Sequence, residues 1–183
     1  SPKDLKTIHF LNKVLDAGVS ILKIEGRARS AEYVKTVTRC YREGVEAYLD
    51  GSFSKEKVAE WNRKLSSVYN RGFWEGYYLG RKMGEWSEQY GSQATRKKIY
   101  VGKVSNYYTK IGVAEVQVEA TDLAVGDDIY IIGPTTGVYQ DTLKELRVDE
   151  QNTDHARQGE ICSFPTREFL RRSDKLYKIV DAV

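Results

Sequence analysis

Hydrophobic residues in the first half of the chain recur at helical spacing. Leu5, Ile8, Leu11 and Leu15 fall on one face of a helix that Gly18 would end. Ser1-Pro2-Lys3-Asp4 has the composition of a helix start, so the pattern predicts a helix from Ser1 to Gly18. The apolar run Val19–Ile24 follows and predicts one short buried strand, which leads through Glu25-Gly26-Arg27 into the next helix.

Two more helices are predicted before the pattern changes. Ser30 would cap a helix that ends at Gly51, and Ser54 would cap the next, with Phe53 and Val58 at the two positions of a hydrophobic staple. The segment 69–90 is rich in glycine and aromatic residues, so we expect irregular backbone held by large rings.

The second half alternates with period two, as strands do. Ile99 with Val101, and Ile111 with Val113, each share a face, whereas Ala114, Val116 and Val118 continue in the opposite phase. This slip predicts a β-bulge or a strong bend near Val113-Ala114. Further strands are predicted at 128–132, 138–148, 160–164 and 175–180. About six short strands separated by turns indicate a small closed β-barrel.

The pattern therefore predicts an α+β protein of two domains. Residues 1–92 form a mostly helical domain with one strand, and residues 97–183 form the six-stranded barrel. Charge changes near the same boundary, because residues 1–96 carry 17 Lys+Arg and 12 Asp+Glu whereas residues 97–183 carry 12 and 14. The positive first half is compatible with an anionic partner.

Composition limits the class of protein. No apolar run approaches the roughly 18 residues of a membrane span, and no leader opens the chain, so we expect no membrane. Two cysteines are too few for a disulfide framework or a self-contained metal site, which predicts a reduced, cytoplasmic protein with no metal or cofactor of its own. The chain opens at Ser1 and its one methionine is Met83, so we expect a fragment of a longer protein.

The segment after the predicted strand is the first candidate site. The carboxyl end of a parallel strand is where α/β folds place their sites, and Glu25, Arg27 and Arg29 would meet there. Guanidinium forks suit carboxylate or phosphate. The alternative, which the residues alone favour, is a structural ion pair between Glu25 and an arginine that pins the loop.

An aromatic and basic stretch is the second candidate. Such residues stack on bases and hold phosphates, which predicts RNA or substrate binding. The alternative, favoured by the residues alone, is that the rings pack a joint between domains. The residues of this stretch are Arg71, Phe73, Trp74, Tyr77, Tyr78, Arg81 and Lys82.

Several motifs, taken together, resemble peptidase family U-32. They are Ser1-Pro2-Lys3-Asp4-Leu5, Lys23-Ile24-Glu25-Gly26-Arg27 with Ser30 and Tyr33, Tyr41-Arg42, and Asn70-Arg71-Gly72-Phe73 with Gly76-Tyr77. This collagenase-like family includes proteins for tRNA 5-hydroxyuridine formation and for oxygen-independent ubiquinone hydroxylation. The run Leu123–Ile129 with Gly133-Pro134 is also similar to the second-domain barrel of elongation factor Tu.

The resemblance implies the end of an upstream β/α-barrel domain followed by the family's C-terminal β-barrel. The upstream part would be the main partner of this chain, and in hydroxylation members it binds a four-iron–four-sulfur cluster through four cysteines. Some members place a cysteine after the Ser-Pro-Lys-Asp-Leu motif, where this chain has Lys6. A cluster is therefore expected in the longer protein and not in this chain.

Three functions follow as expectations. The first is an accessory region of a protein that hydroxylates the tRNA wobble uridine, with tRNA as partner and Glu25, Arg27 and Arg29 at the rim of the active site. The second is a collagenase-like peptidase, and the third is a non-catalytic barrel that binds protein or RNA. Truncation would leave the strand Val19–Ile24 frayed, covered by helices, or paired in a homodimer.

Overall fold

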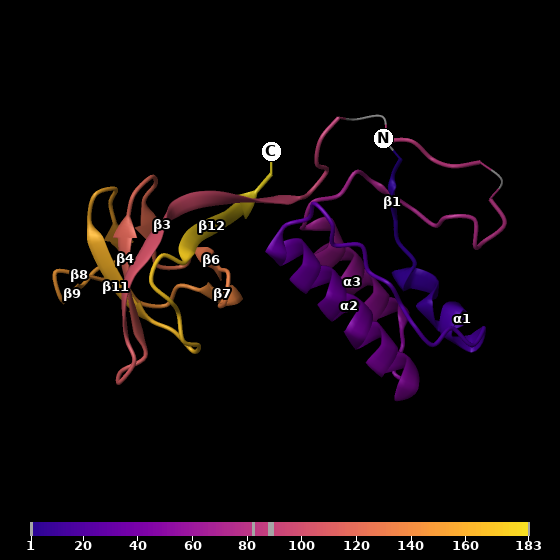
Figure 1. The fold of residues 1–183 in the computed structure, drawn as a ribbon, viewed down its shortest axis with the longest axis horizontal. Coiled ribbons are helices and arrows are strands. Elements are labelled where there is room, and N and C mark those ends of the chain that lie inside the picture. The colour runs from indigo at the N-terminus through magenta and orange to yellow at the C-terminus, as the bar shows by residue number, and fades with distance from the viewer. Residues whose placement is uncertain (1, 82, 88–89, 183) are drawn as a thin grey trace. The chain divides into compact units, whose positions relative to one another are not determined.

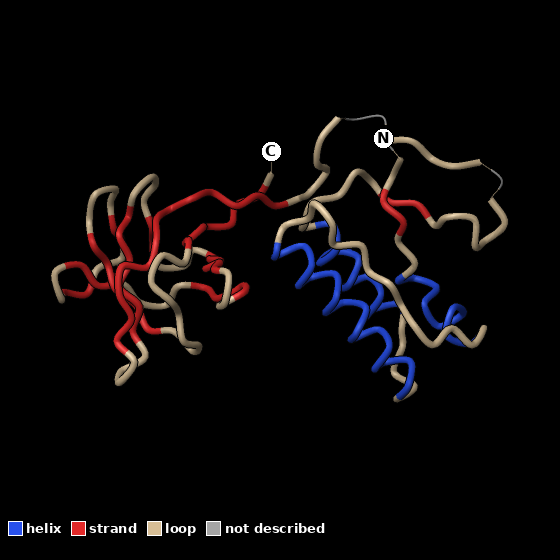
Figure 2. Tube along the Cα trace, in the orientation of Figure 1, coloured by secondary structure: helices blue, strands red, loops and turns tan. Residues whose placement is uncertain are grey.

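A computed structural model describes residues 2–81, 83–87 and 90–182 (Figure 1). The chain forms two compact units, Ser1–Thr95 and Arg96–Ala182. Helices are confined to the first unit among the described residues, whereas strands occur in both (Figure 2). The protein is thus of the α+β class, with an antiparallel sheet in its second unit.

The first unit is built on an antiparallel pair of helices. Its elements are β1 (Asp4–Leu5), the 3-10 helix η1 (Ile8–Phe10), α1 (Leu11–Asp16), α2 (Ala31–Leu49), α3 (Lys55–Ser66) and β2 (Phe73–Trp74). The predicted cap of α3 is confirmed, because the Ser54 hydroxyl accepts a hydrogen bond of 3.3 Å from the Lys57 amide. The core of the unit contains Ile8, Leu11, Val37, Cys40, Ala47, Trp61 and Leu65.

The predicted helix from Ser1 to Gly18 is wrong in its first part. Residues 4–5 form a strand, and the helical turns begin only at Ile8; Ser1, the expected cap, lies outside the described residues. The Lys3 amide donates to the Glu85 carbonyl at 3.1 Å, and the Asp4 amide donates to the Gly72 carbonyl at 2.8 Å. Pairing with a distant segment has overridden the local helix signal.

The predicted strand Val19–Ile24 is also wrong. This segment has no regular secondary structure. Leu22 and Ile24 pack against the helical core, whereas Ile21 is 85% exposed, so buried and exposed positions do alternate. Among the described residues, no strand pairs with this segment. The parallel pair of this unit is β1 with β2 instead.

The second unit contains ten strands. They are β3 (Arg96–Tyr108), β4 (Val113–Val118), β5 (Leu123–Ala124), β6 (Asp128–Gly133), β7 (Gly137–Thr142), β8 (Arg147–Val148), β9 (Gln151–Asn152), β10 (His155–Ala156), β11 (Ile161–Pro165) and β12 (Lys175–Asp181). Eight of them form one sheet in the order β7-β6-β12-β3-β4-β11-β8-β9, and β5 pairs with β10 separately. These pairings are antiparallel throughout the unit.

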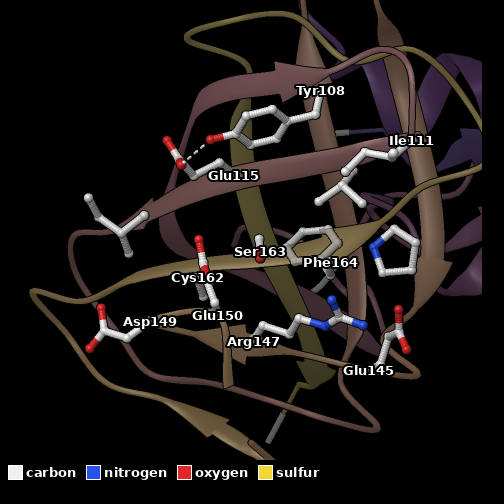
Figure 3. Close-up of a pocket in the computed structure, with 13 residues that line it drawn as sticks. Tyr108, Ile111, Glu115, Glu145, Arg147, Asp149, Glu150, Cys162, Ser163 and Phe164 are labelled. Atoms are coloured by element: carbon white, nitrogen blue, oxygen red, sulfur yellow. Dashed lines mark hydrogen bonds between the residues drawn. The ribbon is translucent and has the colours of Figure 1, made fainter. Parts of the chain in front are cut away.

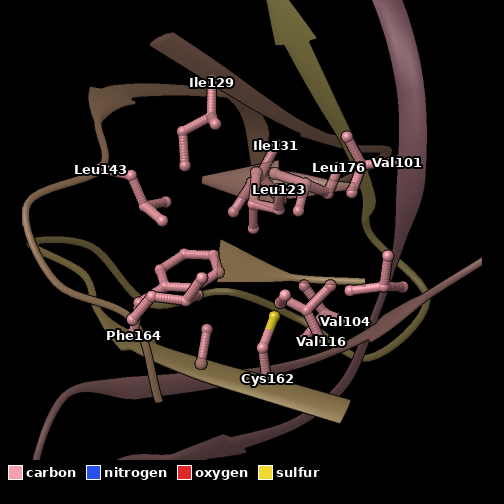
Figure 4. Close-up of a cluster of buried hydrophobic side chains, with 14 of the residues drawn as sticks. Val101, Val104, Val116, Leu123, Ile129, Ile131, Leu143, Cys162, Phe164 and Leu176 are labelled. Carbon is pink, nitrogen blue, oxygen red and sulfur yellow. The ribbon is translucent and has the colours of Figure 1, made fainter. Parts of the chain in front are cut away.

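Alternate residues of the large sheet build a single core (Figure 4). Val101, Val104, Val116, Ile131 and Leu176 are at most 1% exposed. Gly102, within β3, crosses its neighbour so closely that a Cβ there would overlap the carbonyl oxygen of Gln117. A glycine is therefore required at this point of the sheet.

Two details of the predicted barrel differ from the structure. The sheet has eight strands and not six, and no pairing joins its edge strands β7 and β9 among the described residues, so a closed barrel is not confirmed. The register shifts lie between Val104 and Asn106 and between Leu176 and Tyr177, and not at Val113-Ala114. The phase slip arises because Ile111 belongs to the turn that joins β3 to β4.

No helix in the described ranges combines the length and apolar character needed to cross a membrane.

Candidate functional site

Pairing of β1 with β2 brings together residues that are far apart in the sequence. Asp4 lies opposite Phe73, and the Lys6 amide donates to the Trp74 carbonyl at 2.9 Å. Gly72 adopts a φ of +79°, a conformation that favours glycine, where the chain enters β2. This pairing places the carboxylate of Asp4 beside Arg71.

Two arginines converge on that carboxylate. The Asp4 Oδ1 accepts from Arg29 Nη2 at 2.8 Å and from Arg71 Nη2 at 2.9 Å, and Oδ2 accepts from the Arg71 backbone amide at 3.0 Å. The side chains of Asp4 and Arg29 are 13% and 14% exposed, and that of Arg71 is 31% exposed. One carboxylate thus faces two guanidinium groups, and the excess charge is positive.

Tyrosine rings complete this arrangement, which we call the Asp4 cluster: Asp4, Arg29, Tyr33, Tyr69 and Arg71. The Arg29 guanidinium carbon lies 5.1 Å from the centroid of the Tyr33 ring and 4.8 Å from that of Tyr69. Burial raises the pKa of Tyr33, and the hydrogen bond to Asp4 raises the pKa of Arg71. Arg29 is therefore held between a carboxylate and two rings, and Arg71 is held by its hydrogen bonds to Asp4.

The Asp4 cluster is suited to holding an anion. Arg71 retains a buried Nε that has no hydrogen-bond partner in the part of the chain that the structure describes. The Arg29 guanidinium, held by a carboxylate and by two rings, presents its remaining donors in a fixed geometry, which matches phosphate or carboxylate oxygens. The Asp4 cluster therefore combines an excess of positive charge with hydrogen-bond donors of fixed orientation.

The three residues predicted to form a rim do not act as one group in the structure. Glu25 Oε1 accepts from the Arg27 backbone amide at 2.7 Å, which closes a tight turn in an exposed loop. Ala28 follows with a φ of 56°, and only Arg29 reaches the Asp4 cluster. The ion pair that pins this loop therefore joins Arg29 to Asp4, and Glu25 contributes through its carboxylate, which accepts from the Arg27 backbone amide.

The residues of the aromatic and basic stretch have separate surroundings. Phe73 packs against the helical core under Lys6, whose Nζ lies 4.1 Å from the ring centroid. The rings of Trp74 and Tyr77 meet edge to face at 5.2 Å. Arg81 forms ion pairs with Glu75 and Glu85, so its charge is neutralised locally. Lys82 lies outside the described residues.

Large side chains of the same segment remain at the surface. Tyr77 is 59% exposed, Tyr78 is 67% exposed and Trp86 is 70% exposed. A base has a flat face that stacks on such rings, so this segment offers stacking surfaces within the unit that holds the Asp4 cluster.

Sequence reasoning identified Arg29 and Arg71 separately and missed their connection. Asp4 was interpreted as part of a helix start, and Tyr69 only as part of an irregular segment. Asp4 is 25 residues from Arg29 and 67 residues from Arg71, so no local spacing rule could have found the cluster.

The two cysteines do not fit an iron–sulfur cluster. Cys40 lies in the helical core and Cys162 in the core of the second unit, and burial raises their pKa values to about 11 and about 12. A four-iron–four-sulfur cluster needs thiolate ligands, commonly four. Across the described residues, no group of three or more His, Cys, Asp or Glu side chains is placed to hold a metal ion.

We expect both thiols to be inert in the native protein. At pH 8 a thiol reagent should label neither cysteine in buffer and both in denaturing urea, which absorbance of the released chromophore measures. Because folding raises both pKa values, the native state favours the protonated thiols, so the free energy of unfolding falls as pH rises from the unfolded pKa of about 8.5 to the folded values of about 11 and about 12. Rapid stoichiometric labelling of the native protein would contradict this expectation.

The sequence of this chain is similar to several known proteins. The model of peptidase family U32 matches residues 1–88. A protein named Collagenase from Porphyromonas gingivalis is 54% identical over 97% of this chain and 43% of its own length. The uncharacterized protease MJ0090 of Methanocaldococcus jannaschii is 34% identical over all of this chain and 45% of its own length.

More distant relatives carry another name. The tRNA hydroxylation protein P1 of Bacillus subtilis is 29% identical over 83% of this chain and 36% of its own length. The chain therefore spans less than half the length of each of these three relatives.

Proposed function

Because the chain belongs to peptidase family U32, we propose that it is the accessory, RNA-binding region of a protein that hydroxylates the wobble uridine of tRNA. The observation that carries this proposal is the Asp4 cluster, in which two oriented arginines exceed the charge of one carboxylate. A phosphate of the RNA backbone is the anion that such a site suits, and the exposed rings of the 77–86 segment supply surfaces for bases.

The proposal also covers the other predicted parts. Glu25, Arg27 and Arg29 would line the rim of the active site of the whole protein, while the remaining half supplies the reactive groups and any iron–sulfur cluster. The second unit would be an accessory domain that closes into a β-barrel similar to the second domain of elongation factor Tu. The eight-stranded sheet of this unit, which encloses a single core, supports the proposal of a barrel.

Binding to an anticodon stem-loop RNA tests the role of this chain. We expect Arg71→Ala to weaken binding at least tenfold and Tyr77→Ala to weaken it severalfold, measured by fluorescence anisotropy at fixed salt. Arg63→Ala, which removes the same charge from the exposed face of α3, is the matched control and should leave affinity within twofold. Equal losses in Arg71→Ala and Arg63→Ala would reduce the interaction to general electrostatics and overturn the proposal.

The second candidate is a collagenase-like peptidase. The higher identity to the protein named Collagenase, 54% against 29% for the tRNA hydroxylation protein, favours it. The two candidates separate in the whole protein. Loss of 5-hydroxyuridine from tRNA in a strain without the gene supports hydroxylation, whereas gelatin cleavage by the purified protein with unchanged tRNA supports the peptidase.

A further inference from the structure

The outer face of the second unit is hollowed over Ser163 (Figure 3). In register across the sheet, Ser163 of β11 lies between Glu115 of β4 and Arg147 of β8. Its neighbours on the same side of β11 are Ile161 and Pro165, two residues away in each direction. Because serine is smaller than all four surrounding residues, a hollow of about 680 Å³ forms, within the roughly 300–1,000 Å³ of ligand sites.

The walls of this hollow are partly apolar. Ile161 is 49% exposed, Ile111 is 70% exposed in the β3–β4 turn, and Tyr108 is 43% exposed. Covering these exposed apolar side chains is favourable, because it removes apolar surface from water. This favours binding of an apolar group of a partner in the hollow.

The rim of the hollow is acidic. Glu145 precedes β8, and Asp149 and Glu150 form the tip of the β8–β9 hairpin, where their φ angles of 50° and 63° are typical of a tight hairpin turn. On the opposite side, Glu115 accepts from Ser105 Oγ at 2.7 Å and from Tyr108 Oη at 2.9 Å, so neutral donors hold its carboxylate in place.

Several other carboxylates of the unit form ion pairs with lysine or arginine. Elsewhere Lys103 pairs with Glu119, Arg167 with Asp141, and Arg96 with Asp128. Around the hollow, and within the described residues, no ion pair with lysine or arginine is found for Glu115, Glu145, Asp149 or Glu150. The Nε of Arg147, the one cation in the lining, donates to Asn152 Oδ1 at 3.0 Å.

We propose that this hollow, which we call the Ser163 groove, binds an extended peptide segment of a partner protein in which an apolar side chain stands between basic ones. In an extended segment, residues two apart point to the same side and lie about 7 Å apart. An apolar side chain would then enter over Ser163 while lysine or arginine on either side reaches Glu115 and the Asp149–Glu150 tip. Four carboxylates would repel the phosphates of a nucleic acid, so the Ser163 groove recognises the opposite charge to the Asp4 cluster.

Two variants of the 183-residue chain test this inference with a fluorescent acetyl-Lys-Ser-Leu-Ser-Lys-amide peptide, in which the leucine and both lysines point to the same side of an extended segment. Ser163→Phe fills the hollow from an outward position, and the double variant Glu145→Gln with Glu150→Gln removes two charges with little change of shape. We expect each to weaken binding at least tenfold by anisotropy, and affinity for the unaltered chain to fall as salt rises. Glu168→Gln, an exposed acid outside the groove, is the control and should bind as the unaltered chain does.

Several results would overturn the proposal. They are undetectable peptide binding by the unaltered chain, binding unchanged in Ser163→Phe, equal binding of a peptide in which glutamate replaces lysine, and displacement of the peptide by oligouridylate. Circular dichroism of each variant should match that of the unaltered chain, because the substituted side chains all point away from the core. The outcome is independent of RNA binding by the first unit, since no residue is shared.

Discussion

Replacing Gly102 by alanine is expected to destabilise the second unit by about 3 kcal/mol or more, close to the upper end of measured overpacking effects. A Cβ at this position would overlap the carbonyl oxygen of Gln117 and lie 2.9 Å from its carbonyl carbon. Both are backbone atoms of the paired strand β4, so no side chain can rotate to relieve the overlap. The free energy of unfolding in urea, followed by circular dichroism, measures the change.

Asn106→Ala on the same strand is the control for this experiment. Asn106 is exposed, and its substitution should change the unfolding free energy by less than about 0.5 kcal/mol. If Gly102→Ala lies within 1 kcal/mol of the unaltered protein, the close approach of β3 and β4 is not present in solution.

Replacing Asp4 by alanine is expected to destabilise the first unit by about 3 kcal/mol, because two partly buried arginines then lose their common carboxylate. The same change removes the carboxylate oxygen that accepts a hydrogen bond from the backbone amide of Arg71, two residues before β2. Fluorescence of the buried Trp61 during urea unfolding reports the loss.

An exposed carboxylate provides the comparison. Asp16 accepts one hydrogen bond of 2.7 Å from Tyr48 Oη at the surface, so Asp16→Ala should cost less than about 1 kcal/mol. The double variant Asp4→Ala with Arg29→Ala should lose less than the sum of the two single changes, because the charge left unpaired is smaller. Strict additivity would contradict a shared Asp4 cluster.

Elements with local signals could be predicted from the sequence. The helices α2 and α3 each follow a serine and have an apolar stripe, although Ser54 makes a capping hydrogen bond and Ser30 does not, and β6, β11 and β12 have alternation bounded by turns. Each of these patterns is complete within about 20 residues. The α+β class followed from them directly.

Elements that depend on distant partners could not be predicted. Leu22 and Ile24 alternate with exposed positions as strand residues do, yet a strand also needs a neighbour, and sequence pattern carries no information about whether one is present. In the same way, Asp4 forms part of a strand because residues 72–74 lie beside it. The Asp4 cluster depends on that pairing, so its charged residues were visible in the sequence but their common partner was not.

The β1–β2 pairing gives the first unit an order of assembly. The α2–α3 pair joins segments adjacent in the chain, whereas pairing Asp4 with Phe73 closes a loop of 69 residues, which has a larger entropic cost. The helices should therefore form before the strand pair, and the strand pair should open first under mild denaturant. Because Asp4 and Arg71 meet only after this closure, affinity for an anion would report that the last folding step is complete, and amide hydrogens of residues 4–6 should exchange before those of the helices.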